Sequence, residues 1–289
     1  MRHLAQPGPA PAERIESLAG GGLLFGYILD PGQTLVAALT APLVAAGMQS
    51  AAITFVDAAL APFRFVLPGP PQDGAHVAWF SAPHAPRGDP ARPTLVERAN
   101  ATFGWRDGAP FVHCHGVWVE PDGTSRGGHM LPEETVLAAP ARARAWALAT
   151  VAITADPDPE TNFPLFHPVP ARGGGMSGTL RLVAARIRPN QEIGAALVAL
   201  CHRHGFRAAT LRGSLGSLIG ASFTDGRVVP GRATEVLVRH GRVAPGADGA
   251  LAATLDLVVV DAAGRPHEGR LAAGENPVCI TFELMVEGD

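Results

Sequence analysis

Three histidines stand close together in the segment PFVHCHGVWVEPDGTSRGGHM, which begins at Pro110. His113 and His115 are two positions apart in a strand-like run, so both side chains are expected on one face, with Cα atoms roughly 6 to 7 Å apart. The Asp-Gly pair that follows predicts a hairpin turn, which would return His129 to the neighbourhood of the first two. Three neutral imidazoles on a rigid hairpin suit a divalent ion, zinc above all, with one coordination position left open.

The alternative interpretation is that these histidines are structural or surface residues, as a single histidine on a strand usually is. A second segment, DGALAATLDLVVVDAAGRPHEGRL, aligns with this one at an offset of 141 positions and replaces the histidines with Thr254, Asp256 and Arg270. An arginine would repel a cation, and Asp256 and Arg270 could instead pair with each other. The metal site is therefore predicted in the first half of the chain only.

The elements that must position the histidines are repeated along the chain. The segment GQTLVAALTAPLVAAGMQSAAI from Gly32 aligns without a gap with NQEIGAALVALCHRHGFRAATL from Asn190, an offset of 158 positions. In both segments apolar residues recur at helical spacing and stop at a glycine, Gly47 or Gly205, which predicts a helix that ends there. Each copy is expected to run strand, helix, strand and hairpin. The offset changes because the first copy carries a longer insertion, roughly residues 67–92.

The hairpin segment, with its His-x-His and Gly-Gly-His, resembles the central signature of the plant and prokaryote conserved domain, called PPC or DUF296. GSLGSLIGASF at residues 213–223 is similar to a strand of that family. The resemblance covers roughly residues 22–150 and 178–289. It implies an α+β fold in which a twisted, largely antiparallel sheet has helices on one face, and a homo-oligomer, usually a trimer. It also implies an association with DNA, since the plant members accompany AT-hook segments.

Two tandem PPC-like domains are therefore expected, the second a degenerate copy. The expected boundaries are an N-terminal extension over residues 1–21, a domain with the histidine site over 22–154, a Pro/Gly-rich linker over 155–177 and a second domain over 178–289.

A metal-dependent reaction would also need groups that move protons and hold a ligand. A bound metal lowers the pKa of its water toward 7 and polarises carbonyls, which supports hydrolase, hydratase or lyase chemistry on a small carboxylate or carbonyl compound. Three acidic side chains near the histidines or in the linker are candidates for general acid or base, although the ordinary interpretation of each is a surface or capping residue: Glu133, Glu134 and Glu160. Candidates for substrate contact are Arg126, Asn162 and His167.

Composition limits the classes of function. The formal net charge is -3, with 23 basic residues that are all arginine, so the chain has no general attraction for DNA and no lysine for a Schiff base. The motif GRPHEGR contains the Gly-Arg-Pro core of an AT-hook but falls where a hairpin turn is expected. Three scattered cysteines and the lack of a long apolar run favour a cytoplasmic protein without a membrane span. DNA-associated regulation is the alternative to the metal-dependent enzyme.

Overall fold

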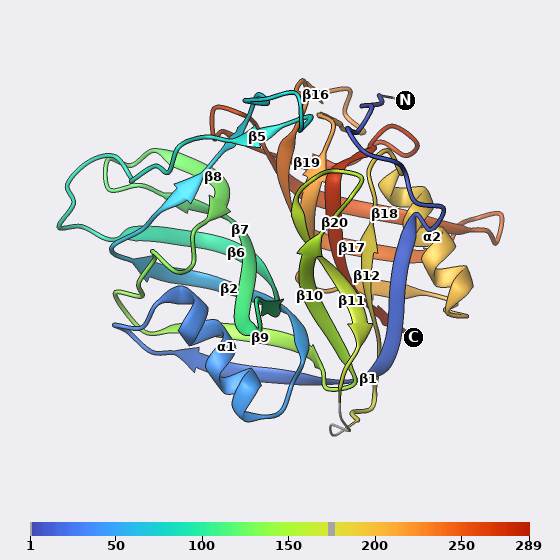
Figure 1. Ribbon diagram of the computed structural model, residues 1–289, viewed down its shortest axis with the longest axis horizontal. Coiled ribbons are helices and arrows are strands. Elements are labelled where there is room, and N and C mark those ends of the chain that lie inside the picture. Colours follow the sequence, from blue (N-terminus) through green and yellow to red (C-terminus); the bar gives the residue numbers. More distant parts are fainter. Residues whose placement is uncertain (1, 173–176) are drawn as a thin grey trace.

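The computed structural model describes residues 2–172 and 177–289 and consists mainly of antiparallel β-strands (Figure 1). It contains two helices of 11 residues each, α1 (Leu35–Ala45) and α2 (Ile193–Arg203). The expected antiparallel sheet is present, but the helical share is too small for the expected α+β description, and the fold is mainly β. Neither helix of the described residues is long and apolar enough to cross a membrane.

The strands fall into two units, which Figure 1 shows side by side. The first unit, on the left, holds α1 and the strands β2 (Ser50–Leu60), β3 (Phe65–Val66), β4 (Pro68–Gly69), β5 (Trp79–Phe80), β6 (Thr94–Arg106), β7 (Ala109–Val119), β8 (Ser125–Met130) and β9 (Ala141–Leu148). The second unit holds α2 and the strands β12 (Leu180–Ile187), β13 (Ala209–Leu211), β14 (Leu215–Leu218), β15 (Ala221–Ser222), β16 (Val228–Val229), β17 (Thr234–Pro245), β18 (Leu251–Val260), β19 (Pro266–Arg270) and β20 (Val278–Gly288).

One long strand, β1 (Ile15–Leu29), belongs to both units. Its residues from Ile15 to Gly22 pair antiparallel with β12, and those from Gly22 to Leu29 pair antiparallel with β9. A single sheet therefore continues through the molecule in the order β19-β18-β17-β13-β20-β12-β1-β9-β2-β6-β7-β8-β3. Residues 1–21 were expected to be an extension, yet the part from Ile15 onward is a strand of this sheet.

Most of the segment expected as a linker is ordered. Strands β10 (Val151–Pro157) and β11 (Pro164–Pro170) form an antiparallel hairpin, and β10 touches β6 through a single parallel pair. Phe163 and Phe166 of this hairpin are buried. Residues 173–176 of the expected linker lie outside the described residues. The hairpin thus packs between the two units, as its buried phenylalanines require.

The two helices lie at equivalent places in the repeat. Helix α1 follows Thr34, and α2 follows Glu192; each of these side chains accepts a hydrogen bond from a backbone N–H of the first turn. Gly47 and Gly205 follow the helix ends with φ of 75° and 65°, a conformation that favours glycine. These positions keep the offset of 158 that aligns the two sequence segments.

Each helix covers one face of its half of the sheet and leaves the opposite face uncovered by that helix. Strand β9 shows the alternation: Ala143, Ala145 and Ala147 are buried in the core under α1, whereas Arg142 and Arg144 are exposed on the other face. That other face of the first unit is where the second unit packs.

The second unit contacts this face through β14 and β17. The buried side-chain amide of Asn100 donates to the carbonyls of Ser214 and Val238, at 2.9 and 2.8 Å. A small apolar cluster joins the units beside it, formed by Val117, Leu237, Val258 and Val260. The contact fixes β17 against the strands that carry the histidines.

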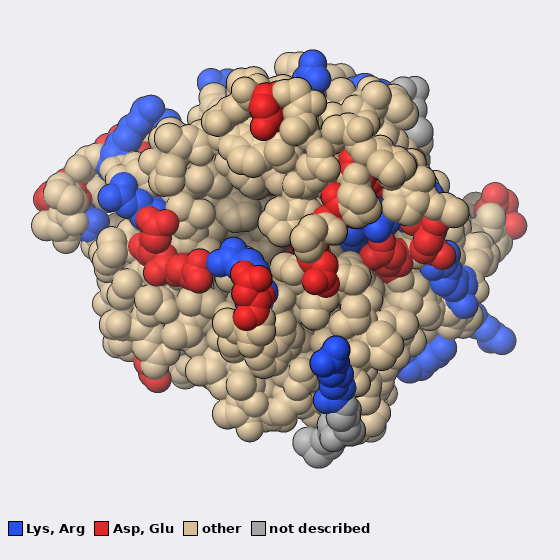
Figure 2. Space-filling view, viewed as in Figure 1, with Lys and Arg blue, Asp and Glu red and all other residues tan. Residues whose placement is uncertain are grey.

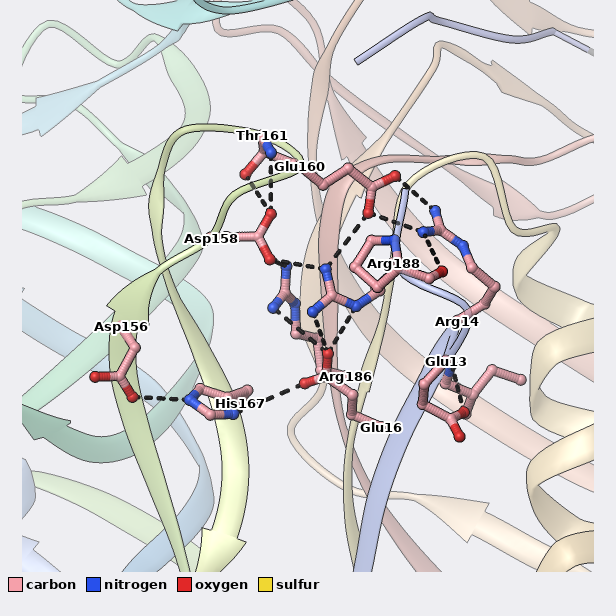
Figure 3. Close-up of polar contacts among 12 residues, drawn as sticks. Glu13, Arg14, Glu16, Asp156, Asp158, Glu160, Thr161, His167, Arg186 and Arg188 are labelled. Atoms are coloured by element: carbon pink, nitrogen blue, oxygen red, sulfur yellow. Dashed lines mark hydrogen bonds and ion pairs between the residues drawn. The ribbon is translucent and has the colours of Figure 1, made fainter. Parts of the chain in front are cut away.

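A network of ion pairs ties the β10–β11 hairpin to β1 and β12 (Figure 3). Asp158 lies 2.8 Å from Arg186 and 2.7 Å from Arg188, and all three side chains are largely buried. Glu160 makes two hydrogen bonds with Arg14, at 2.8 and 2.9 Å, and a longer contact with Arg188. Buried charges are tolerated only when they are paired in this way.

Candidate metal centre

Strands β7 and β8 bring the three histidines together. His115 pairs directly with His129, and His113 lies two residues earlier on β7, on the same face. The Nε2 atoms of His113 and His115 are 2.9 Å apart, and one ring nitrogen of each of the three residues lies within 4.8 Å of the others. Two nitrogens on one tetrahedral zinc ion would be about 3.4 Å apart, so the rings need only a small adjustment to share an ion.

Residues of the second unit orient two of these rings. His113 Nδ1 lies 2.8 Å from a carboxylate oxygen of Glu283, and His115 Nδ1 lies 3.0 Å from the carbonyl oxygen of Val236. A carboxylate or carbonyl on one ring nitrogen is the usual way to direct the other nitrogen at a metal. The carboxylate of Glu235 is 2.9 Å from His115 Nε2 and so stands beside the point at which the rings meet.

The pKa values of His115 and His129 are shifted in opposite directions. Burial disfavours a charged His115, but the Glu235 carboxylate and the hydrogen bond with Val236 outweigh it and raise the pKa of His115 above its ordinary value. Burial, followed by the charges of His113 and His115, holds the pKa of His129 well below its ordinary value. His129 is therefore neutral near pH 7, the form in which an imidazole binds a metal.

The histidines line a cavity of about 380 Å³ between the units. Aromatic rings lie along it: Trp79 and Phe163 stack with centroids 5.3 Å apart, and the ring of Phe80 lies 5.4 Å from that of His129. The face in Figure 2 is hollowed near its centre, on the side of β7 and β8 that faces the β10–β11 hairpin; uncharged atoms surround the hollow except along its lower edge, where basic and acidic side chains lie. A cavity of this size accepts a small molecule.

The residues present fit a divalent cation. Glu235 and Glu283 are 6% and 5% exposed, so two carboxylates stand almost out of water beside three imidazoles. Two negative charges balance one divalent ion, and such a balance removes most of the cost of burial. One oxygen of Glu283 and the hydroxyl of Thr281 are buried without a hydrogen-bond partner in the described residues, and both residues line the cavity. These polar atoms are free to contact a ligand.

The substrate contacts and proton-transfer residues expected from the sequence lie elsewhere. Arg126 is on β8, but at three residues from His129 it points to the opposite face, toward Glu120. Glu133 is exposed and pairs with Arg106 at the rim of the cavity, and Glu134 is exposed in the same turn. Neither carboxylate lines the cavity.

The three candidates from the expected linker serve the hairpin instead. The side chain of Asn162 donates to the carbonyl of Ala75. Glu160 is held by Arg14 and Arg188, and His167 by Asp156 at 2.8 Å (Figure 3). The structure brings none of them to the histidines: Glu160 and His167 face residues at or beside β1 and β12, and Asn162 faces the segment around Ala75.

Among the residues that the structure describes, no metal-binding set lies at the corresponding position in the second unit. Asp256 and Arg270 pair across β18 and β19, as His115 and His129 do across β7 and β8, and their side chains form an ion pair at 2.9 Å. The sequence had allowed for this ion pair between Asp256 and Arg270 without requiring it. The segment GRPHEGR forms the turn and strand β19, as expected for a hairpin.

Sequence reasoning missed Glu235 and Glu283, the two acidic residues at the centre. Their signal was a single carboxylate in an otherwise apolar strand, as in VCITFELMV around Glu283. A lone buried acid in such a strand requires a partner. The sequence gives no indication of which partner, because the contact crosses between the units.

No protein-family model matches the chain, and no curated protein sequence matches it. Solved structures do. The matches are structures of the PPC fold. A PPC protein from Pyrococcus horikoshii has 16% identity and a TM-score of 0.40, covering 53% of this chain and 97% of that one. A metal-containing protein from Archaeoglobus fulgidus has 19% identity and a TM-score of 0.39, covering 53% and 98%. A proposed DNA-binding protein from Ralstonia eutropha JMP134 has 17% identity and a TM-score of 0.35, covering 49% and 88%.

Proposed function

We propose that this chain binds one divalent metal ion, zinc in the first instance, through His113, His115 and His129. We also propose that the chain uses this ion to act on a small carboxylate or carbonyl compound in the adjoining cavity, as a hydrolase, hydratase or lyase. The supporting observation is the arrangement of ring nitrogens: two Nε2 atoms meet at 2.9 Å while each Nδ1 is held by an oxygen of the second unit.

The chain's own residues divide the work around such an ion. The ion supplies a Lewis acid and a bound water of lowered pKa. Glu235, next to His115 Nε2, is positioned to accept or return a proton at a ligand beside the histidines. The unpartnered hydroxyl of Thr281 can donate a hydrogen bond to an oxygen of that ligand. Trp79, Phe80 and the hairpin give the cavity apolar walls around it.

Cobalt(II) gives a test of this role, since its visible absorption reports changes among its ligands. Cobalt-loaded protein is titrated with malonate, a small dicarboxylate, and with propane-1,3-diol, a neutral molecule of the same length. We expect malonate alone to change the spectrum. Thr281→Val removes only the hydroxyl and is expected to weaken malonate binding about five-fold. A cobalt spectrum that no carboxylate or carbonyl compound changes would contradict the proposed reaction.

A second candidate is a DNA-associated regulatory module, the role that the family resemblance implies. Its support in this chain is a cleft lined by arginines, described below. The net charge of -3 works against it. Retention of a 20-base-pair duplex at physiological salt, with an affinity that falls steeply as salt rises, would favour this candidate over the metal-dependent reaction.

A further inference from the structure

A second cleft opens on the same face of the first unit's sheet as the histidine site, beside the contact of Asn100 with the second unit. Its volume is about 940 Å³. One wall consists of residues from β1, β2, β6 and β9, and the other of residues from β13, β17 and β18. The cleft therefore lies between the two units, as the histidine cavity does.

The walls of this cleft are strongly basic in a protein that is acidic as a whole. Asp256 is the one acidic residue among the described residues that line it, and the chain has a formal net charge of -3. Six arginines line it: Arg98, Arg142, Arg144, Arg212, Arg239 and Arg242. Such a concentration of one sign in a concave surface raises the local concentration of anions.

Two of the arginines are free to bind a ligand. Arg212 forms an ion pair with Glu287, and Arg239 forms one with Glu268. Asp256, the acidic residue that lines the cleft, forms its ion pair with Arg270, which does not line it. Within residues 2–172 and 177–289, by contrast, Arg142 and Arg144 have neither an ion-pair partner nor a side-chain hydrogen bond, and both are exposed. An unpaired guanidinium keeps its full set of donors for a ligand.

The register of the sheet places these two side chains in parallel. Arg142 and Arg144 are two residues apart on β9, so they share a face with Cα atoms roughly 7 Å apart. Arg144 pairs with Gly26 on one side and Thr54 on the other. A Cβ atom built at Gly26 would meet nothing within 4 Å, so the space beside Arg144 is open. The pair can thus reach two anionic groups of one ligand.

The cleft is also the counterpart of the histidine site in the repeat. Thr254 and Asp256, which line it, take the places of His113 and His115 in the aligned hairpins. The first unit faces them with arginines, whereas the second unit faces the histidines with Glu235 and Glu283. The two related cavities therefore carry opposite charge.

We propose that this cleft binds a small ligand with two or more phosphate groups, held by Arg142 and Arg144. The planar fork of arginine matches a phosphate with two hydrogen bonds, and several positive charges favour a ligand of several negative charges. The volume is that of a small-molecule site. Phosphates of a nucleic acid backbone present the same chemistry, and the experiment separates the two sources.

Inorganic tripolyphosphate is the probe, and its affinity for the full chain is measured by calorimetry. The Arg142→Ala/Arg144→Ala double variant is expected to bind it about 100-fold more weakly, at about ten-fold for each charged contact. The matched control is Arg87→Ala/Arg172→Ala, which removes two exposed arginines that do not line the cleft and should leave the affinity unchanged. His129→Ala, measured like the wild type in metal-free protein, should also leave the affinity unchanged, because His129 lines the other cavity and not this cleft.

Three results would overturn the proposal. Tripolyphosphate binding that survives in the double variant would remove the two arginines from the site. An equal loss in the Arg87/Arg172 control would indicate attraction to charge in general. A duplex of 20 base pairs that binds and depends on Arg142 and Arg144, in a protein that does not bind tripolyphosphate, would assign the cleft to nucleic acid. Circular dichroism of each variant checks that the fold is retained.

Discussion

Replacing Asp158 with Asn should destabilise the protein, and by an amount that depends on pH. Burial of Asp158 opposes its ionisation, but Arg186 and Arg188 outweigh this and lower its pKa from 3.8 to about 2. A carboxyl with a depressed pKa stabilises the fold fully above its unfolded pKa, and this contribution is lost as pH falls through the folded pKa. The loss is therefore expected between about pH 4 and pH 2.

The size of the effect follows from the contacts. The pKa difference corresponds to at most about 2.5 kcal/mol, and screening by nearby solvent reduces it to about 1 to 2 kcal/mol. The Asn variant also leaves Arg186, whose side chain is 3% exposed, with only the weaker ion pair to Glu16 at 3.8 Å, so a loss of about 2 to 3 kcal/mol of stability is expected at pH 7.

Urea unfolding followed by the fluorescence of the four tryptophans measures this difference at pH 7 and at pH 3. We expect the difference between wild type and the Asn variant to shrink as the pH falls toward 2, because the wild-type carboxyl becomes neutral. Asp225→Asn, which breaks an exposed pair with Arg227, is the control and should leave stability unchanged. A difference that is the same at pH 7 and at pH 3 would refute the role of the charge.

Three further predictions concern the site and the assembly. Glu283→Gln should lower zinc affinity at least about ten-fold in a competition titration, because the Glu283 carboxylate orients the ring of His113. An unchanged zinc affinity would show that Glu283 has no part in metal binding. Gly127→Val should destabilise the protein and reduce zinc content, since a Cβ there would lie 2.6 Å from Val260; a stable, fully loaded variant would show that the close packing is dispensable. The family resemblance predicts a trimer, and sedimentation that shows a monomer would contradict it.

The sequence predicted the local elements well because their signals are local. Apolar residues at helical spacing that stop at Gly47 and at Gly205 predicted both helices and their offset. Strand alternation and an Asp-Gly turn gave the three-histidine cluster. Each of these depends on residues within one helix or one hairpin.

The features that the sequence did not predict come from contacts between the units. Glu235 and Glu283 reach the histidines only because β17 and β20 pack against the first unit. The ion pairs of Glu160 withdraw it from the proposed chemistry, and its partner Arg14 lies 146 residues away. The role of β1 as a strand of both units was hidden as well, since its pairing changes partner at Gly22 without any break in the sequence pattern.

The metal content of the purified protein tests the central claim most directly. Elemental analysis of the wild-type protein, after incubation with zinc and removal of excess, should give about one ion per chain. His129→Ala should lose most of it while keeping its fold, and Arg270→Ala, the equivalent change in the second unit, should keep it all. Wild-type protein that stays empty with zinc, cobalt and manganese, or that binds equal metal in both variants, would contradict the account and return the three histidines to a structural role.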